Sequence, residues 1–143
     1  MADEHTSTQG LLAIRIVTPD RILVDATADA VELPARSGYM EALYGAAPLL
    51  AELGAGEVRL HGGNSGNAKF FVASGFAEIL PQRVTLLAET ALKTGEIDPA
   101  QAQGELDHAQ QDWNSAGDDA EKYSYAQGEI RTAEEKLAAS KDR

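Results

Sequence analysis

The chain of 143 residues has the length of one domain, or of one domain with a small appendage. Its 12 Lys and Arg against 23 Asp and Glu give a net charge of −11, which argues against a nucleic-acid partner and against a basic membrane-docking patch. The absence of cysteine excludes disulfides, thiolate zinc sites and cysteine nucleophiles. No apolar run reaches membrane-spanning length, and residues 1–5 are polar, unlike a signal peptide, so we expect no direct membrane insertion.

The first two thirds of the chain have the pattern of short strands. Residues 1–10 show no periodicity and predict a flexible tail. Residues 11–95 predict a β domain, because apolar residues alternate in the first run and Gly or Pro separates the later ones. The pattern favours an antiparallel sandwich or barrel, with strands expected at 12–17, 28–33, 57–60, 69–73, 76–80 and 84–88.

Residues 96–143 have the pattern of two helices. Asp98 and Pro99 form a helix start, and Asp118-Asp119 after Gly117 forms a second one. Three- and four-residue spacings predict an antiparallel hairpin. Its expected seam consists of Ala102, Leu106, Ala109 and Trp113 in the first helix and Ala120, Tyr123, Gln127, Ile130, Glu134 and Leu137 in the second.

The residues predict no catalytic, metal or cofactor site. The three histidines, His5, His61 and His108, are scattered, and Ser74 lacks a nucleophile-elbow frame. The glycine-rich run at 62–66 lacks the lysine and the helix of a phosphate loop and predicts a flexible hairpin loop. Aromatic residues of the helices, Trp113, Tyr123 and Tyr125, could stack on a ligand but have the spacing of packing residues. These features favour a binding or structural protein over an enzyme.

Three segments resemble the epsilon subunit of bacterial F-type (rotary) ATP synthases. Residues 12–21, LAIRIVTPDR, resemble the opening strand and turn of that family, and Ala47-Pro48-Leu49-Leu50 resembles its H-A-P-L-L segment. Residues 74–91, SGFAEILPQRVTLLAETA, are similar to its G-G-F-x-E-V-x-x-D-R-V-T-V-L-A-D-T-A almost position for position. The resemblance covers residues 11–140 in the same order and spacing.

This resemblance implies an α+β fold, mainly β, in which a ten-stranded antiparallel β-sandwich is followed by an antiparallel two-helix hairpin. It implies a non-catalytic central-stalk subunit without a cofactor, which links the gamma subunit to the c ring and couples proton flow to ATP synthesis. Residues 96–143 would reach the alpha/beta catalytic head and regulate ATP hydrolysis. The complex would place the chain peripherally on the cytoplasmic face of the plasma (inner) membrane.

The family's gamma and c-ring contact corresponds to residues 38–50, where this chain departs from the family pattern. Tyr39 replaces an acidic residue, Glu41 a glycine, Tyr44 a proline and Ala46 a histidine. Gly38 and Gly45 are expected at turns whose backbone angles favour glycine. By resemblance, the interface residues are Gly38, Tyr39, Glu41, Tyr44, Gly45, Pro48 and Leu49.

A nucleotide site is not favoured. Relatives that sense ATP carry I-D-x-x-R, and Ile97 and Asp98 match its start, but Gln101 stands where the arginine would be. Glutamine has neither the charge nor the donor fork that arginine offers a phosphate, so we interpret Asp98 as a helix cap. The alternative function is a free-standing regulatory or ligand-binding β domain with an acidic helical hairpin, which would not co-purify with gamma.

Overall fold

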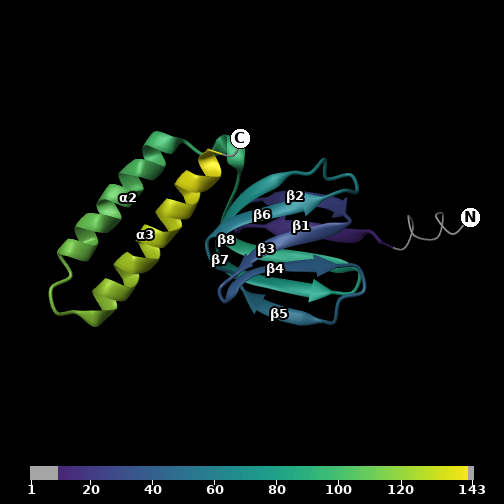
Figure 1. The fold of residues 1–143 in the computed structure, drawn as a ribbon, viewed down its shortest axis with the longest axis horizontal. Coiled ribbons are helices and arrows are strands. Elements are labelled where there is room, and N and C mark those ends of the chain that lie inside the picture. The colour runs from purple at the N-terminus through teal and green to yellow at the C-terminus, as the bar shows by residue number, and fades with distance from the viewer. Residues whose placement is uncertain (1–9, 142–143) are drawn as a thin grey trace, which may run out of the picture. The chain divides into compact units, whose positions relative to one another are not determined.

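The computed structural model describes residues 10–141, which divide between Leu92 and Lys93 into two compact units. The first holds the strands and the second the helices (Figure 1). The expected tail lies outside the described residues, apart from Gly10. The elements are β1 (Leu12–Val17), β2 (Ile22–Ala28), β3 (Ala30–Ala35), β4 (Gly38–Leu43), β5 (Leu49–Glu52), β6 (Gly56–His61), β7 (Lys69–Leu80), β8 (Arg83–Lys93), η1 (Thr94–Glu96), α2 (Pro99–Asn114) and α3 (Ala120–Ser140).

Eight strands, not ten, form the sandwich of the described chain. Their order is β2-β1-β8-β7-β6-β3-β4, and β5 also pairs with β7. The first part of β7 pairs with β6 and its second part with β5, so β7 runs from one layer into the other. β8 follows β7 through the two-residue turn at 81–82 and pairs with β7 and β1. The described residues therefore form eight strands where ten were expected.

The crossing of β7 is made at a bend that does not interrupt the strand. Ser74 and Gly75 have φ angles of 63° and 127°, in the region of positive φ that only glycine adopts without a steric cost. The Gly75 carbonyl still accepts a hydrogen bond from the Leu53 N–H at 2.9 Å. The two strands expected at 69–73 and 76–80 are therefore one strand with a local change of direction.

One strand pair is parallel, so the expectation of an entirely antiparallel sandwich is wrong for that pair. β1 runs alongside β8 in the same direction, with Ala13 opposite Arg83 and Val17 opposite Leu87. A parallel pair needs a long connection, and here strands β2 to β7 supply it. The sequence of β1 alone does not reveal this partner, because period two is common to both kinds of pairing.

The core of the sandwich follows the expected alternation. Leu12, Ile14 and Ile16 of β1 are buried, while Ala13 and Arg15 between them are exposed. The largest fully buried side chains are Phe71, Leu12, Ile14, Ile16, Leu33, Leu60, Ile79, Leu86, Val31, Val58, Val72 and Val84, and all of them except Phe71 belong to the hydrophobic core cluster.

The glycine-rich loop after β6 is tied to β2 rather than free. The Asn64 side chain accepts a hydrogen bond from the Thr27 N–H at 2.7 Å, and the Asn64 N–H donates to the Thr27 hydroxyl at 3.1 Å. The Gly62 N–H donates to the Asn67 side chain at 2.9 Å. The expected flexible loop is therefore held by side-chain amides, and no phosphate-loop lysine or helix follows it.

The helical unit starts where expected. The Asp98 carboxylate accepts hydrogen bonds from the N–H groups of Ala100 and Gln101, and Asp119 caps α3 in the same way. None of the helices in residues 10–141 is long and apolar enough to span a membrane.

The seam between the helices is made of alanine. Ala102 and Ala109 of α2 are buried, as expected. In α3, however, the expected seam is wrong by one position: Ala126, Ala133 and Ala139 are buried, Gln127 and Glu134 are exposed, and Ile130 and Leu137 lie half-buried beside the seam. Alanine permits two helices to approach closely, and the larger side chains then flank the contact.

Candidate interaction surface

The segment 38–49 turns around one edge of the sandwich. Gly38, Tyr39 and Glu41 lie on β4, Tyr44 and Gly45 follow in a turn, Pro48 lies in the loop and Leu49 begins β5. Because β4 and β5 belong to different layers, the structure spreads these residues along an edge rather than gathering them into one cluster. Gly38 and Gly45 have φ angles of 134° and 84°, which confirms the expected permissive turns.

Tyr39 is exposed and yet fixed in position. Its side chain is 61% exposed, and its hydroxyl accepts a hydrogen bond from the Glu57 N–H at 3.0 Å. A Cβ at Gly56 would meet the same hydroxyl, so the phenol lies directly over the Gly56 backbone. An aromatic side chain with a fixed ring loses little conformational entropy when a partner covers it.

The other polar and turn residues of the segment are held by the backbone. Glu41 is exposed on β4 opposite Glu32, whose carboxylate lies 3.1 Å from the His61 ring nitrogen Nε2. The Gly45 N–H donates to the Pro81 carbonyl at 2.7 Å, which ties the turn after β4 to the β7–β8 turn. The segment is therefore an ordered part of the sandwich.

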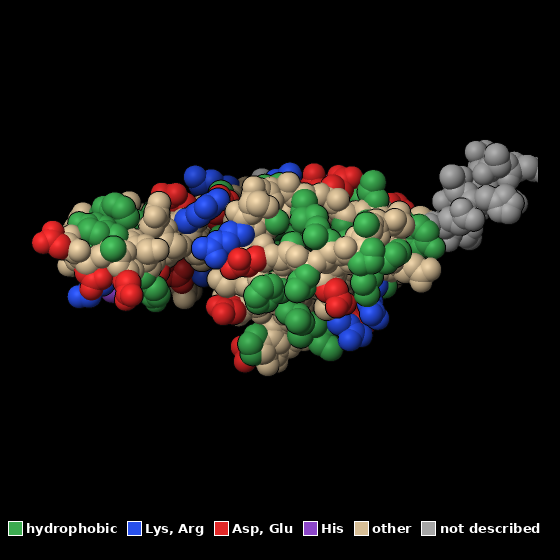
Figure 2. Space-filling view, turned by 90° about the horizontal axis from the view of Figure 1, so that it is seen from below, with side chains coloured by type: hydrophobic (Ala, Val, Ile, Leu, Met, Phe, Trp, Pro, Cys, Tyr) green, Lys and Arg blue, Asp and Glu red, His purple; other side chains and the backbone are tan. Residues whose placement is uncertain are grey.

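Large apolar side chains of this segment face outward. Besides Tyr39, the side chains of Leu43, Tyr44 and Leu49, and of Leu50 directly after the segment, are between 41% and 69% exposed. Figure 2 shows hydrophobic side chains gathered over the strand-bearing unit on the face in view. Scattered exposed apolar residues are normal, but a contiguous run of this kind is typical of a surface that a partner covers.

A second apolar feature was not found from the sequence. On the outer face of the layer that contains β1, Val17 lies opposite Ile22 of β2 on one side and Leu87 of β8 on the other. The backbone of Gly75 lies against the Leu87 carbonyl, and Phe76 is the next residue of β7. Ile22, Leu87 and Phe76 are 53–58% exposed. We call Ile22, Val17, Leu87 and Phe76 the outer-face row. Its signal in the sequence is the doubled apolar residues, such as Leu86-Leu87, which break the alternation of the strand.

The two residues that match the start of the nucleotide-sensing motif, Ile97 and Asp98, directly precede α2. Ile97 is buried, at 3% exposure, and the Asp98 carboxylate accepts two backbone hydrogen bonds from the first turn of α2. Gln101 is exposed on that turn. The residues present therefore offer neither a free carboxylate nor a cation for a nucleotide.

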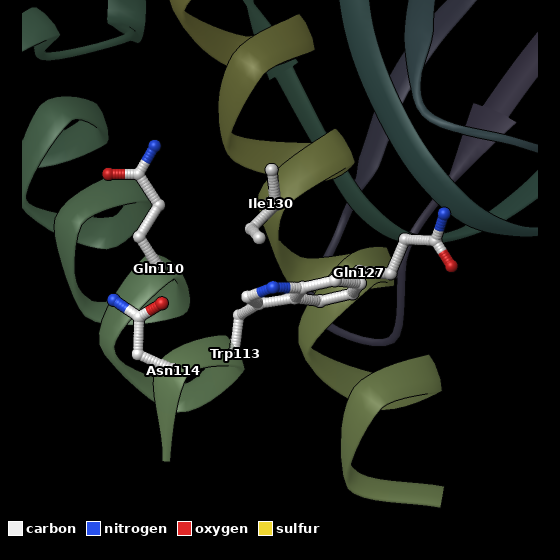
Figure 3. A pocket seen from close by; sticks show the side chains of 5 residues that line it. All are labelled: Gln110, Trp113, Asn114, Gln127 and Ile130. Carbon is white, nitrogen blue, oxygen red and sulfur yellow. The ribbon is translucent and has the colours of Figure 1, made fainter. Parts of the chain in front are cut away.

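The helical unit carries an open pocket of about 470 Å³, lined by Gln110, Trp113, Asn114, Gln127 and Ile130 (Figure 3). The Trp113 ring meets the Tyr123 ring edge to face, with centroids 4.8 Å apart, so these two aromatics pack together as their spacing indicates. Tyr125 is 70% exposed. The pocket has no charged lining residue and holds no acid–base pair for catalysis.

Histidines do not converge with other ligating residues. His61 lies beside Glu32, and His108 lies 3.6 Å from Asp112 on the same helix, while His5 is outside the described residues. Within residues 10–141, no group of three or more His, Asp or Glu is placed to hold a metal ion.

Comparison with known proteins gives the family. The model of the ATP synthase delta/epsilon chain β-sandwich domain matches residues 11–94. The chain belongs to the epsilon subunits of F-type ATP synthases. It is 42% identical over 103 residues to the ATP synthase epsilon chain of Koribacter versatilis, covering 71% of each chain. It is 38% identical over 129 residues to the ATP synthase epsilon chain 2 of Ralstonia nicotianae, covering 90% of this chain and 92% of that one.

Solved structures share the fold at low identity. A chain of the Euglena gracilis mitochondrial ATP synthase, in a structure of its OSCP/F1/c-ring part, matches with a TM-score of 0.75 and 18% identity over 90% of this chain and 80% of that one. A chain of the Tetrahymena thermophila mitochondrial ATP synthase central stalk and c ring matches with a TM-score of 0.62 and 11% identity, covering 90% and 96%. This member of the epsilon family therefore keeps both the sandwich and the helices of distant ATP synthase chains.

Proposed function

We propose that the chain is a non-catalytic rotor subunit of a proton-transporting ATP synthase, which joins the gamma subunit to the c ring and so couples proton flow to ATP synthesis. The observation that carries the proposal is the set of large exposed apolar side chains on the sandwich that the family model matches. Such side chains are typical of a surface covered by a partner. The complex would hold the chain on the cytoplasmic face of the plasma membrane as a peripheral component.

The segment 38–49 is assigned to the gamma subunit and the c ring, and the outer-face row to gamma. Tyr39 is the best anchor in this segment, because its exposed ring is already fixed by the hydrogen bond from Glu57. Tyrosines are enriched among the residues that dominate binding energy at protein interfaces. Tyr44, on the turn tied to Pro81, adds a second aromatic at the same edge.

No nucleotide is assigned to Ile97 and Asp98. The first is buried and the second caps α2, while the arginine of the family's sensing motif is replaced by Gln101. Equilibrium dialysis of the full chain with ATP should give no binding at this site. Saturable ATP binding that Asp98→Asn abolishes, with α2 still helical by circular dichroism, would overturn the assignment.

The assembly is tested by affinity purification of the tagged full chain from native membranes. The gamma and c subunits should co-purify with the wild-type chain. Tyr44→Glu and Leu87→Glu place a charge in the proposed contacts and should each lower the recovery of gamma by about tenfold. Gln111→Glu adds the same charge on the exposed face of α2 and should leave recovery unchanged. Failure of gamma to co-purify with the wild-type chain would favour a free-standing β domain.

If the helical unit contacts the catalytic head, we expect electrostatic attraction to contribute little to that contact. Residues 96–143 carry 12 acidic and five basic side chains, and residues 99–113 contain no Lys or Arg. An acidic surface on the head would therefore repel it, and less so at high salt. ATP hydrolysis by the reconstituted head should differ little between the full chain and a chain ending at Gly95. Strong inhibition by the full chain that fades as salt rises would contradict this.

A further inference from the structure

An ion pair joins the two helices toward the open end of the hairpin, where α2 begins and α3 ends. Nζ of Lys136, on α3, donates hydrogen bonds to both carboxylate oxygens of Glu105, on α2, at 3.1 and 3.3 Å. The Lys136 side chain is only 16% exposed and that of Glu105 is 40% exposed. The ion pair of His108 with Asp112, in contrast, links two residues of the same helix. The Lys136–Glu105 pair therefore ties α2 directly to α3.

The antiparallel course of the helices explains how these two side chains meet. Helical side chains lean toward the N-terminus of their own helix. Lys136 therefore leans toward the connecting loop and Glu105 leans toward the open end, so their charged groups come together between the two backbones. The buried residues one turn away on each helix are Ala102 and Ala133, which bring only methyl groups into the seam. We therefore expect the ion pair to supply a large share of the contact at this end.

The other end of the hairpin is held together by the connecting loop and by an aromatic pair (Figure 1). In the loop, the Asp119 N–H donates a hydrogen bond to the Ala116 carbonyl at 3.1 Å. Next to the loop, the Trp113 ring packs edge to face on the Tyr123 ring. Trp113 lies about 12 Å along α2 from Glu105, because a helix rises about 1.5 Å per residue. The two ends of the hairpin are therefore held by different means.

We propose that the Lys136–Glu105 pair is a clasp for the open end of the hairpin, and that breaking it lets the last turns of α3 part from α2 while the loop end stays paired. Proteins open locally where few apolar contacts hold an element in place, and the alanine seam makes the open end such a place. At the loop end, the short connection keeps the two helices close together. The hairpin is thus a conformational device with one fixed end and one end closed by a pair of charges.

The burial of the pair sets the size of the expected effect. An exposed ion pair contributes little to stability, whereas removing one partner of a buried pair is strongly destabilising. The Lys136 side chain is largely buried and that of Glu105 is partly exposed, so this pair lies between the two limits. Its loss should raise local opening of the open end by about tenfold. Added salt should have a smaller effect, because salt screens partly buried pairs less than exposed ones.

Amide hydrogen exchange of the full chain, followed by NMR, tests the clasp residue by residue. Glu105→Gln removes the charge and keeps the size of the side chain. It should speed up the exchange of amides 134–139 by about tenfold and leave amides 125–130, nearer the loop, unchanged. Glu134→Gln, the same change at an exposed position of α3, should leave both groups unchanged. The fluorescence of Trp113, the single tryptophan, should be the same in wild type and both variants, because the loop end stays paired.

Exchanging the two charges gives a second test, and it needs no partner protein, so it does not depend on the proposed place in a rotor. Glu105→Lys and Lys136→Glu should each speed up exchange at 134–139, and the two together should slow it again because the pair is restored with its signs reversed. Lack of recovery in the double variant, or equal effects of Glu105→Gln and Glu134→Gln, would overturn the clasp. Equal acceleration at both ends of α3 by Glu105→Gln would overturn the separate opening of one end.

Discussion

The hydroxyl of Tyr39 accepts a hydrogen bond from the Glu57 N–H at 3.0 Å, and this bond fixes an exposed ring on β4 against the start of β6. The space for the ring exists because residue 56 is glycine. A Cβ there would meet the Tyr39 hydroxyl and would lie 2.9 Å from Pro34 Cβ. A small residue on one strand thus sets the position of an aromatic side chain on another.

Gly56→Ala should therefore destabilise the sandwich, by about 1–3 kcal/mol, because the new methyl group overpacks the site and displaces the phenol. Thermal unfolding followed by circular dichroism measures this. In the background of Tyr39→Ala the same substitution should cost less, since the hydroxyl that it displaces is gone. Equal costs in both backgrounds would show that the two residues are not coupled.

Ser74→Gly should stabilise the sandwich by about 0.5–1 kcal/mol. Ser74 has a φ of 63°, which costs a residue with a Cβ free energy, and its side chain is exposed, so little packing is lost. Gly75→Ala, at the next residue, serves as the control with the opposite expected effect. Its methyl group would press on the Leu87 carbonyl, so it should destabilise the sandwich by about 1–3 kcal/mol. A lower melting temperature for Ser74→Gly would contradict the inference that the backbone at Ser74 is strained.

A chain that ends at Gly95 should remain folded. The fully buried large side chains all belong to the strands, so the removed residues take none of them away. Far-ultraviolet circular dichroism should retain the β signal, and urea should unfold the shortened chain cooperatively. Precipitation, or loss of the β signal, would show that the helices are needed for the sandwich to fold.

Gly104→Ala and Gly128→Ala should each stabilise the hairpin by about 0.5–1 kcal/mol. Both glycines are exposed within helices, and a Cβ at either would meet no other atom within 4 Å. Trp113 fluorescence during urea unfolding measures the gain. Gly117→Ala serves as the control that should lose stability, because Gly117 has a φ of 62° between the helices. A gain at Gly117 would contradict the structure of that turn.

The sequence predicted well what depends on neighbouring residues. The alternation in β1 identifies its buried face, and Asp98 with Pro99 identifies the start of α2. These features are local, because a strand's period and a cap need only a few consecutive side chains. The parallel pairing of β1 with β8 could not be predicted this way, since it depends on segments 70 residues apart along the chain.

Only the part of the interaction surface that is formed by neighbouring residues could be predicted from the sequence. The exposed apolar residues of segment 38–49 are close to one another in the sequence, so they could be identified from it, although the structure spreads them along an edge. The outer-face row combines residues from three regions of the chain, and only strand register brings Ile22 and Leu87 to the two sides of Val17. The seam of α3 was misplaced because the expected three- and four-residue spacing passed through Gln127 and Glu134, whereas the helices pack on the alanines directly before them.

The alanine seam has a thermodynamic consequence for the hairpin. Opening a contact made of methyl groups exposes little apolar surface, and both the heat-capacity change and the denaturant slope scale with the surface exposed. The balance between paired and separated helices should therefore vary little with temperature, and the transition reported by Trp113 should be broad. A contact of this kind leaves the side chains at its margin, such as the half-buried Ile130 and Leu137 and the Trp113–Tyr123 pair, to decide how often the helices part.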